Sequence, residues 1–471
     1  MHKMDFGVIG LGVMGQNLAR NLGRSGHTVA VYNRSNERTR HFMEAYASGK
    51  QFHAPDDLES FVMSLSEPRK VLLMVKAGAA TDGFIQRLVQ LLDRGDVLMD
   101  GGNAYFEDTS RRQNACNDLG IGYLGIGVSG GELGALYGPS IMVGGPAEAY
   151  RLVGPILESI AARGPRGTCC ALLGAGAAGH YVKMVHNGIE YAVMQILSEA
   201  YDIMKRGLGM NADEMAGVLE QWHEGELGSY LLKITAAILR RRDAESGAPL
   251  LEEILDTAAQ KGTGKWSSQS ALETGSPSPT IAAAVFARVV SALKGERVSA
   301  EQYLCGPSPV VDGSRKEMLP RLRSAVLLAT ATAYAQGLRQ IGDASSTYGY
   351  CLDLSEVIRV WMAGCIIRAR MLIPMSQAFE RQPDLPLLFL EEPFRSLWEK
   401  HQLKFRSIVA QAHRAGIPIP SMSSALGFVD AYRTGRLPAN LLQAQRDFFG
   451  AHTYQRMDRE GAFHTEWERM Q

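Results

Sequence analysis

The stretch that most restricts the fold of this chain is a glycine-rich turn set between two short apolar strands near the N-terminus. The pattern runs from a strand at 6–9 through Gly10-Leu11-Gly12-Val13-Met14-Gly15 and a helix at 16–23 to a second strand at 27–32. A GxGxxG turn in this setting predicts a dinucleotide-binding βαβ unit. The first glycine permits the tight turn, the second lets the backbone approach a pyrophosphate, and the third lets the helix pack on the strand.

The end of the second strand indicates which dinucleotide is bound. It runs into Asn33-Arg34-Ser35, at the place where an Asp or Glu would hold the ribose hydroxyls of NAD. No acid is present there, and Arg34 and Ser35 can instead bind a 2′-phosphate. Unless Arg34 is an ordinary surface arginine, the sequence predicts NADP as the cofactor.

Three more strands end in loops that carry polar or glycine residues. The strands at 71–75, 97–100 and 123–128 lead into the loops with Val75-Lys76-Ala77, Asn103 and Ser129-Gly130-Gly131. Parallel α/β sheets bind ligands at the carboxyl ends of their strands, so we expect these loops over one sheet edge. A last strand is expected at 139–145. A second GxGxxG at 174–179 precedes a long helix and no returning strand, so we interpret it as a close-packed helix entry.

A row of polar residues on that long helix predicts a buried site. The row shares one helical face, because its spacing follows the helical repeat, and it consists of Lys183, His186, Asn187, Glu190 and Tyr191. The positions between them are apolar, so this face is not a solvated surface. Burying an amine, an imidazole and a carboxyl is costly unless they have partners, which points to a functional site.

The remainder of the chain reads as helical. Helices are expected at 194–205, 212–220, 230–240, 280–293, 322–337 and 355–371. The predicted architecture is an α/β Rossmann-like N-terminal domain (1–178), a large all-α domain (179–434) and a C-terminal tail (435–471).

Three cationic features stand out in the helical part. Lys261-Gly262-Thr263-Gly264-Lys265 reads as a basic loop, Arg288 lies in an apolar helix where it needs an ionic partner, and the tail carries Arg446 and His452. Each alone could be a structural salt bridge. Together they favour a phosphate pocket.

Composition excludes several other classes of function. The 471 residues carry no formal net charge, which argues against a broad grip on nucleic acid or an acidic membrane. The six cysteines show no metal-site spacing, so no metal centre is expected, and scattered thiols indicate a reducing, cytoplasmic setting. No signal peptide and no membrane-length apolar run is visible.

Taken together, the motifs resemble the decarboxylating 6-phosphogluconate dehydrogenases of the β-hydroxyacid dehydrogenase superfamily. The resemblance covers nearly the whole chain and rests on GLGVMGQNLARN (10–21), VKAG (75–78), DGGN (100–103), GVSGGE (127–132), GHYVKMVHNGIEY (179–191), QKGTGKW (260–266), VFAR (285–288), AQG (335–337) and LPANLLQAQRDFFGAHTY (437–454). It implies an enzyme of the pentose phosphate pathway that converts 6-phosphogluconate to ribulose 5-phosphate and carbon dioxide. It also implies a homodimer whose tail reaches the partner's active site.

The resemblance also implies a role for each site residue. Lys183 would be the general base and Glu190 the general acid. NADP would be held by Gly10 to Gly15, Asn33 to Ser35, Val75 to Ala77 and Asn103. The sugar acid would contact Asn103, Ser129, Gly130, Gly131, His186 and Asn187, and its phosphate would contact Tyr191, Lys261, Thr263, Arg288 and Arg446. His452 would help Arg446 to complete the substrate site of the partner.

Several positions depart from the family pattern, and many of the lost residues are charged. The departures are Ala104, Leu133, Leu136, Ala192, Val193, Ala283 and Ala363. Removing both partners of a buried ion pair can leave stability nearly unchanged. We therefore expect an active enzyme in which the residues around the catalytic groups have repacked. Two alternatives stay open: a related β-hydroxyacid dehydrogenase with another substrate, and a catalytically weak sugar-phosphate or NADPH-binding paralogue.

Overall fold

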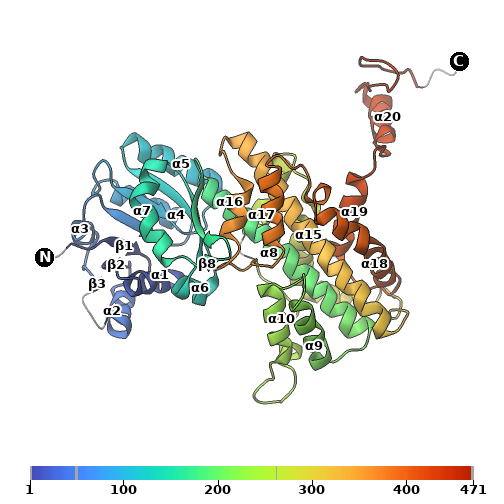
Figure 1. Cartoon of the computed structure of the whole chain (residues 1–471), viewed down its shortest axis with the longest axis horizontal. Helices are drawn as coiled ribbons and strands as arrows, with labels where there is room; N and C mark the ends of the chain where they lie inside the picture. The colour runs from blue at the N-terminus through green and yellow to red at the C-terminus, as the bar shows by residue number, and fades with distance from the viewer. Residues whose placement is uncertain (1–2, 48–50, 261, 468–471) are drawn as a thin grey trace. The chain divides into compact units, whose positions relative to one another are not determined.

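The computed structural model describes residues 3–47, 51–260 and 262–467, and the chain forms two compact units, 1–425 and 426–471. The larger unit begins with an eight-stranded sheet and continues as a set of packed helices (Figure 1). The predicted fold class, a Rossmann-like domain followed by a large helical region, is therefore confirmed.

The sheet has the strand order β10-β7-β6-β5-β4-β1-β2-β3. All neighbouring strands are parallel except β6 and β7. The strands are β1 (Phe6–Ile9), β2 (Val29–Tyr32), β3 (Phe52–His53), β4 (Lys70–Leu73), β5 (Val97–Asp100), β6 (Gly122–Ser129), β7 (Ser140–Gly144) and β10 (Cys170–Gly174). The strand order reverses between β1 and β4: β2 and β3 extend the sheet on one side of β1, and β4 and the later strands extend it on the other. Such sheets bind dinucleotides in the crevice at this point.

Helices cover both faces of the sheet because its strands are apolar on both sides. Phe6 and Val8 of β1 pack with α1 (Val13–Arg24), α2 (Asn36–Tyr46), α6 (Gly131–Tyr137) and α7 (Ala147–Ile160). Ile9, Val71 and Leu73 pack on the other face with α3 (Leu58–Met63), α4 (Ala79–Leu88) and α5 (Phe106–Asp118). Continuous apolar strands of this kind are the pattern of a doubly covered parallel sheet.

The helical part is built around two long helices, α8 (Ala178–Asp202) and α15 (Arg315–Tyr348), which lie side by side (Figure 1). Glycines let α8 pack closely on the sheet. A Cβ at Gly179 would lie 2.3 Å from the carbonyl oxygen of Gly125, and a Cβ at Gly127 would lie 2.4 Å from the Cβ of Lys183. The expected close-packed entry to this helix is thus confirmed.

The other helices of this part are short or medium in length. They are α9 (Ala212–His223), α10 (Tyr230–Arg240), α11 (Leu250–Glu253), α12 (Thr263–Glu273), α13 (Pro279–Ala292), α14 (Lys294–Glu301), α16 (Leu354–Val360), α17 (Leu372–Arg381), α18 (Phe394–Arg414) and α19 (Pro420–Tyr432). The unit 426–471 contains α20 (Ala439–Gly450) and the segment that follows it.

Two helix predictions and one loop prediction were wrong in detail. The segment 194–205 is not a separate helix but the end of α8 and a π-helical turn (Ile203–Gly207). The segment 355–371 is not one helix, because α16 ends at Val360 and irregular chain containing Gly364 (φ 68°) follows. Residues 263–265 are not in a loop; they form the first turn of α12 after a left-handed Gly262.

Candidate active site

The glycine-rich turn after β1 forms a cradle that fits a dinucleotide phosphate. Gly10 has φ 100°, and a Cβ at Gly15 would lie 1.9 Å from the Gly10 carbonyl oxygen, so both positions require glycine. A Cβ at Gly12 would meet nothing within 4 Å, which leaves its side open to a ligand. No side chain caps the start of α1, so its first N–H groups can receive an anion.

The polar residues after β2 lie beside this cradle. Asn33 Oδ1 accepts a hydrogen bond from the Leu11 N–H at 3.1 Å and so ties the end of β2 to the turn. Arg34 and Ser35 are exposed, and no Asp or Glu occupies positions 33–35. These residues fit an NADP 2′-phosphate better than bare ribose hydroxyls.

The loops after β4 and β5 lie against each other at the same sheet edge. A Cβ at Gly102 would lie 2.7 Å from the Val75 carbonyl oxygen and 3.8 Å from the Ala77 nitrogen. Asn103 is exposed and has φ 54°, a backbone conformation that is uncommon for a residue with a side chain. The loop containing Lys76 and the loop containing Asn103 therefore share one edge, as predicted from the ends of their strands.

On α8 the polar face joins Ser129 of β6 in one buried cluster. His186 is the centre: its Nε2 lies 3.3 Å from Ser129 Oγ, and its Nδ1 lies 3.5 Å from Lys183 Nζ and 3.1 Å from Asn187 Oδ1. Glu190 Oε2 lies 3.9 Å from the same Nδ1. Lys183 and His186 are buried, and Glu190 is partly exposed. The structure thus brings together the predicted base, acid and substrate-binding residues of this helix.

Burial shifts the ionisable groups of this cluster in opposite directions. It lowers the pKa of Lys183, although Glu190 and Cys365 oppose the shift. It raises the pKa of Glu190, although Lys183 and Arg288 oppose that shift. Burial and the nearby Lys183 hold the pKa of His186 well below its usual value, so this ring is neutral. The two shifts favour the neutral amine of Lys183 and the protonated carboxyl of Glu190, the forms that a general base and a general acid require.

The loop Ser129-Gly130-Gly131 is held against irregular chain after α16. Gly130 has φ 132°, and a Cβ there would lie 2.4 Å from the Gly364 carbonyl oxygen. Gly131 has φ 64° and opens α6, with nothing within 4 Å of its missing side chain. The close approach fixes the loop, and the open side of Gly131 leaves room for a ligand.

Beyond Glu190, residues predicted to bind phosphate gather around Tyr191. The Arg288 guanidinium lies 3.4 Å from the centre of the Tyr191 ring, and a Cβ at Gly264 would lie 2.6 Å from that ring. Thr263 opens α12 and is half-buried, while Lys261 lies outside the described residues. Across the described chain Arg288 contacts no carboxylate, so the ionic partner expected for it is not supplied by these residues, and a substrate phosphate stays the predicted partner. Its cation is held by a ring face and by the Ala259 carbonyl oxygen at 3.4 Å.

Arg446 and His452 belong to the unit 426–471. Both are exposed, and Arg446 donates to Gln443 Oε1 at 3.1 Å. Between them lies Asp447, which is fully buried and accepts hydrogen bonds from the Thr453 and Thr465 N–H groups and from the Trp467 indole. Burial would raise the pKa of Asp447, but its hydrogen bonds, that of His464 first, lower it to about 2. Asp447 is thus an anchor of this unit, and sequence reasoning assigned it no role.

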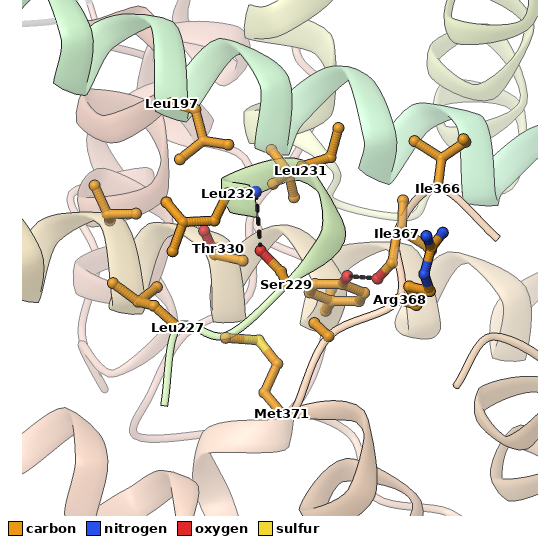
Figure 2. Close-up of a pocket in the computed structure, with 14 residues that line it drawn as sticks. Leu197, Leu227, Ser229, Leu231, Leu232, Thr330, Ile366, Ile367, Arg368 and Met371 are labelled. Carbon is orange, nitrogen blue, oxygen red and sulfur yellow. Dashed lines mark hydrogen bonds between the residues drawn. The ribbon is translucent and has the colours of Figure 1, made fainter. Parts of the chain in front are cut away.

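The residues that depart from the family pattern differ in burial. Ala104, Leu136, Ala192 and Val193 are buried, Ala283 and Ala363 are half-buried, and Leu133 is exposed. Val193 lines a pocket with about 10 Å³ of free space. Leu197, Leu231 and Leu232 line the same pocket (Figure 2). Arg368 lies at one end of that pocket and stacks on Tyr230 at 3.7 Å. The environment of Val193 is therefore largely that of an apolar core position.

Comparison with known proteins covers the chain from end to end. The model of the NAD binding domain of 6-phosphogluconate dehydrogenase matches residues 5–174, and the model of the 6-phosphogluconate dehydrogenase C-terminal domain matches residues 179–467. The chain belongs to the 6-phosphogluconate dehydrogenase family. The predicted resemblance is confirmed.

Individual members of the 6-phosphogluconate dehydrogenase family match over their whole length. The NADP(+)-dependent, decarboxylating enzyme of Bacillus subtilis is 50% identical over 99% of this chain and 100% of its own. The decarboxylating enzyme of Escherichia coli is 48% identical over 99% of this chain and 100% of its own. A solved structure of the Plasmodium falciparum enzyme, studied with NADP+ and with 6-phosphogluconate, superposes with a TM-score of 0.95 at 40% identity, covering 98% and 100% of the two chains.

Two further properties can be stated for the described residues. None of their helices combines the length and the apolar character that crossing a membrane requires. Nor do three or more of their His, Cys, Asp and Glu side chains meet in a group that could hold a metal ion.

Proposed function

We infer that this chain catalyses the oxidative decarboxylation of 6-phosphogluconate to ribulose 5-phosphate and carbon dioxide, with NADP as the electron acceptor. The observation that carries the inference is the buried face of α8, where a lysine of lowered pKa and a glutamate of raised pKa lie in one cluster. That cluster adjoins the edge of a sheet with a cradle for NADP. Full-length identity to decarboxylating enzymes supports the same reaction.

Lys183 starts the reaction as the general base. In its neutral form it accepts the proton of the C3 hydroxyl while NADP, when bound, accepts the hydride from C3. Neutral His186 and Asn187 bind substrate hydroxyls, and Ser129 with Gly130 and Gly131 binds the carboxylate end. Because Lys183 and His186 are buried, water does not compete for these hydrogen bonds.

Lys183 and Glu190 complete the reaction. Oxidation at C3 gives a β-keto acid, and the protonated Lys183 polarises the new carbonyl as carbon dioxide leaves. Glu190, whose pKa burial raises, then delivers a proton to C1 of the enediol.

Cofactor and phosphate binding are assigned to the two sides of this cluster. Gly10 to Gly15, Asn33 to Ser35, Val75 to Ala77 and Asn103 hold NADP. Tyr191, Lys261, Thr263 and Arg288 bind the substrate's phosphate, for which Arg288 has a guanidinium without a carboxylate partner among the described residues.

We further propose that the active enzyme is a cytoplasmic homodimer in which the tail completes the partner's site with Arg446 and His452. On this proposal the chain is divided by role into a cofactor segment (1–178), a substrate and dimerisation segment (179–434) and a tail (435–471). The exposed, cationic Arg446 and the anchored conformation around Asp447 support a binding role for the tail.

The activity is tested by following NADPH formation with 6-phosphogluconate and by quantifying ribulose 5-phosphate. The account predicts equal amounts of the two products. NADPH formation without ribulose 5-phosphate would point to another β-hydroxyacid dehydrogenase, and tight substrate binding without turnover would point to a sensor.

The shared site is tested by mixing two defective variants. Lys183→Ala and Arg446→Ala chains are unfolded together, refolded and assayed. If tails are exchanged, each mixed dimer contains one site with both native residues, and activity exceeds that of either variant alone. No gain, with mixed dimers demonstrated by tagged subunits, would contradict tail exchange. The control mixture contains Arg456→Ala in place of Arg446→Ala. Arg456 is another arginine of the tail and is paired with Asp458.

A further inference from the structure

A buried ionic network lies under the two loops that follow β4 and β5. Its core is Arg112 of α5 and Asp100 at the end of β5, whose side chains are 1% and 0% exposed. Arg112 Nη1 lies 3.4 Å from Asp100 Oδ2, and the Tyr123 hydroxyl donates to the same oxygen at 3.0 Å. Removing ions from water is expensive, so a network this deep needs nearly complete pairing.

The Arg112 guanidinium donates to three acceptors on two segments, the end of β5 and the start of α4. Besides Asp100, its Nε donates to Asp82 Oδ1 on α4 at 2.8 Å, and its Nη2 donates to the Gly78 carbonyl oxygen at 3.2 Å. A planar guanidinium can make all three contacts at once, whereas an ammonium group cannot match that geometry. One side chain thus connects α5, the start of α4 and the end of β5.

The backbone that this network supports lies at the predicted cofactor edge and has two positive φ angles, one of them at a residue with a side chain. Gly78 has φ 92° and Asn103 has φ 54°. Asp100 Oδ1 accepts the Gly102 N–H at 2.9 Å, next to Asn103. A positive φ is ordinary for glycine, whereas the conformation of Asn103 is uncommon and depends on support from its surroundings. Arg112 supplies that support to Gly78 directly and to Asn103 through Asp100.

We propose that Arg112, acting with Asp100, is the positioning residue that sets the loops 75–78 and 101–103 against the nicotinamide half of NADP and the adjacent substrate. The proposal rests on the proposed function for the identity of the ligands. Arg112 touches neither ligand. It acts through Gly78 and Gly102, and so through the loops that carry Lys76 and Asn103.

Thr109, one turn before Arg112 on α5, makes a second connection to the active site. Its hydroxyl lies 2.7 Å from Nδ1 of His180, which is buried in the first turn of α8, ahead of Lys183. The same face of α5 therefore supports both the cofactor loops and the helix that carries the base.

Arg111 provides a matched control in the adjacent position. It also contacts Asp82 Oδ1, at 3.1 Å, but its side chain is 59% exposed and its other carboxylate partner is Asp108. It bonds neither Gly78 nor Asp100. An exposed pair of this kind contributes little to stability and does not reach the loops.

The experiment compares Arg112→Met, Arg112→Lys, Arg111→Met and the double variant Arg112→Met/Asp100→Asn, all in the full chain. NADPH affinity is measured by nicotinamide fluorescence, KM and kcat by steady-state assay, and stability by thermal melting. We expect Arg112→Met to melt earlier and to lose NADPH affinity and kcat/KM by about 10- to 100-fold, because a small displacement of positioned groups has effects of that size. Arg111→Met should change both by less than about 3-fold.

The double variant separates positioning from folding. It removes the carboxylate charge of Asp100, which Arg112→Met alone leaves unpaired, so the melting temperature should recover toward the native value. The loops stay unsupported, so the NADPH affinity should remain low. Recovery of affinity together with melting temperature would overturn the proposal.

Arg112→Lys keeps the charge and should fold, but it should still bind NADPH several-fold more weakly. Native affinity in this variant, or in a folded Arg112→Met protein, would also overturn the proposal. If the native chain failed to turn over 6-phosphogluconate, the proposed function would fail, whereas the NADPH affinities would still decide the role of Arg112.

Discussion

The two ends of the α8 polar face differ in how complete they are. At the catalytic end, Nδ1 of the His186 imidazole lies 3.5 Å from Lys183 Nζ and 3.1 Å from Asn187 Oδ1. At the phosphate end, Arg288 rests on the Tyr191 ring and contacts no carboxylate of the described chain. Two further predicted phosphate-site residues, Arg446 and His452, belong to the unit 426–471.

The difference follows from the chemistry at each end. Acid–base groups need shifted pKa values, and burial within a single packed unit provides them before the substrate arrives. A phosphate is a full charge that the substrate brings, so the cations that receive it must be left without internal partners. The catalytic end is therefore expected to fail through loss of chemistry, and the phosphate end through loss of affinity.

The largest expected effect lies at the catalytic end. Lys183→Ala should lower kcat by about 10²- to 10⁴-fold, because the general base is lost, while substrate binding changes little. NADPH formation and equilibrium binding of 6-phosphogluconate measure the two quantities. Lys205→Ala, which removes a lysine paired with Glu252 just beyond α8, should leave kcat unchanged. A Lys183→Ala enzyme that bound 6-phosphogluconate weakly but kept the native kcat would contradict the placing of the catalytic chemistry at this end.

A similar loss of rate, with a change of pH dependence, is expected at Glu190. The reaction needs a neutral lysine and a protonated glutamate, so kcat/KM should fall at high pH as the acid is lost. Glu190→Gln cannot ionise, and the alkaline decrease should disappear from the pH profile of its remaining activity. Glu220→Gln, at an exposed carboxylate paired with Arg240, should retain the native profile. An unchanged alkaline limb in Glu190→Gln would exclude Glu190 as the acid.

At the phosphate end the expected effect is on affinity. Arg288→Ala should raise KM for 6-phosphogluconate by about 10- to 100-fold, the value of one charge-assisted hydrogen bond, and should leave KM for NADP unchanged. The preference for 6-phosphogluconate over gluconate should shrink by the same factor. Arg242→Ala, at an arginine paired with Asp213, is the control. Equal losses with both substrates would place Arg288 outside the phosphate site.

The smallest effect is expected behind the catalytic face. Val193→Ala should lower the free energy of unfolding by about 1–3 kcal/mol through lost burial and an enlarged cavity, with kcat within about 2-fold of native. Denaturant midpoints and steady-state assays measure the two. Val310→Ala, at an exposed valine, should change neither. A large loss of kcat in Val193→Ala would mean that the repacked surroundings help to set the catalytic geometry.

Local pattern was sufficient to predict the Rossmann-like sheet and the polar face of α8. Strand β1 and the GxGxxG turn lie where apolar runs and glycine spacing placed them, and the spacing of Lys183, His186 and Glu190 put them on one face. The sequence pattern could not predict tertiary contacts, which join segments that are distant in the sequence. Nothing local distinguishes Arg112 from Arg111, although one is buried and the other exposed.

The errors have physical causes of the same kind. Helical periodicity continues past Val360, but the chain there approaches Gly130 closely and turns at Gly364, which interrupts the helix. The 263–265 segment has a glycine-rich, loop-like composition, yet Gly262 adopts a left-handed conformation and starts α12. The contacts of Arg288 with the Tyr191 ring and the Ala259 carbonyl oxygen could not be foreseen from its neighbours in sequence.

The most direct test of the account is a comparison of 6-phosphogluconate with gluconate in the native enzyme, with NADP in both assays. We predict NADPH and ribulose 5-phosphate in equal amounts from 6-phosphogluconate, and a kcat/KM at least about 100-fold lower with gluconate, because the phosphate end then contributes no binding energy. Equal kcat/KM values for the two sugars, or no NADPH from 6-phosphogluconate, would contradict the account.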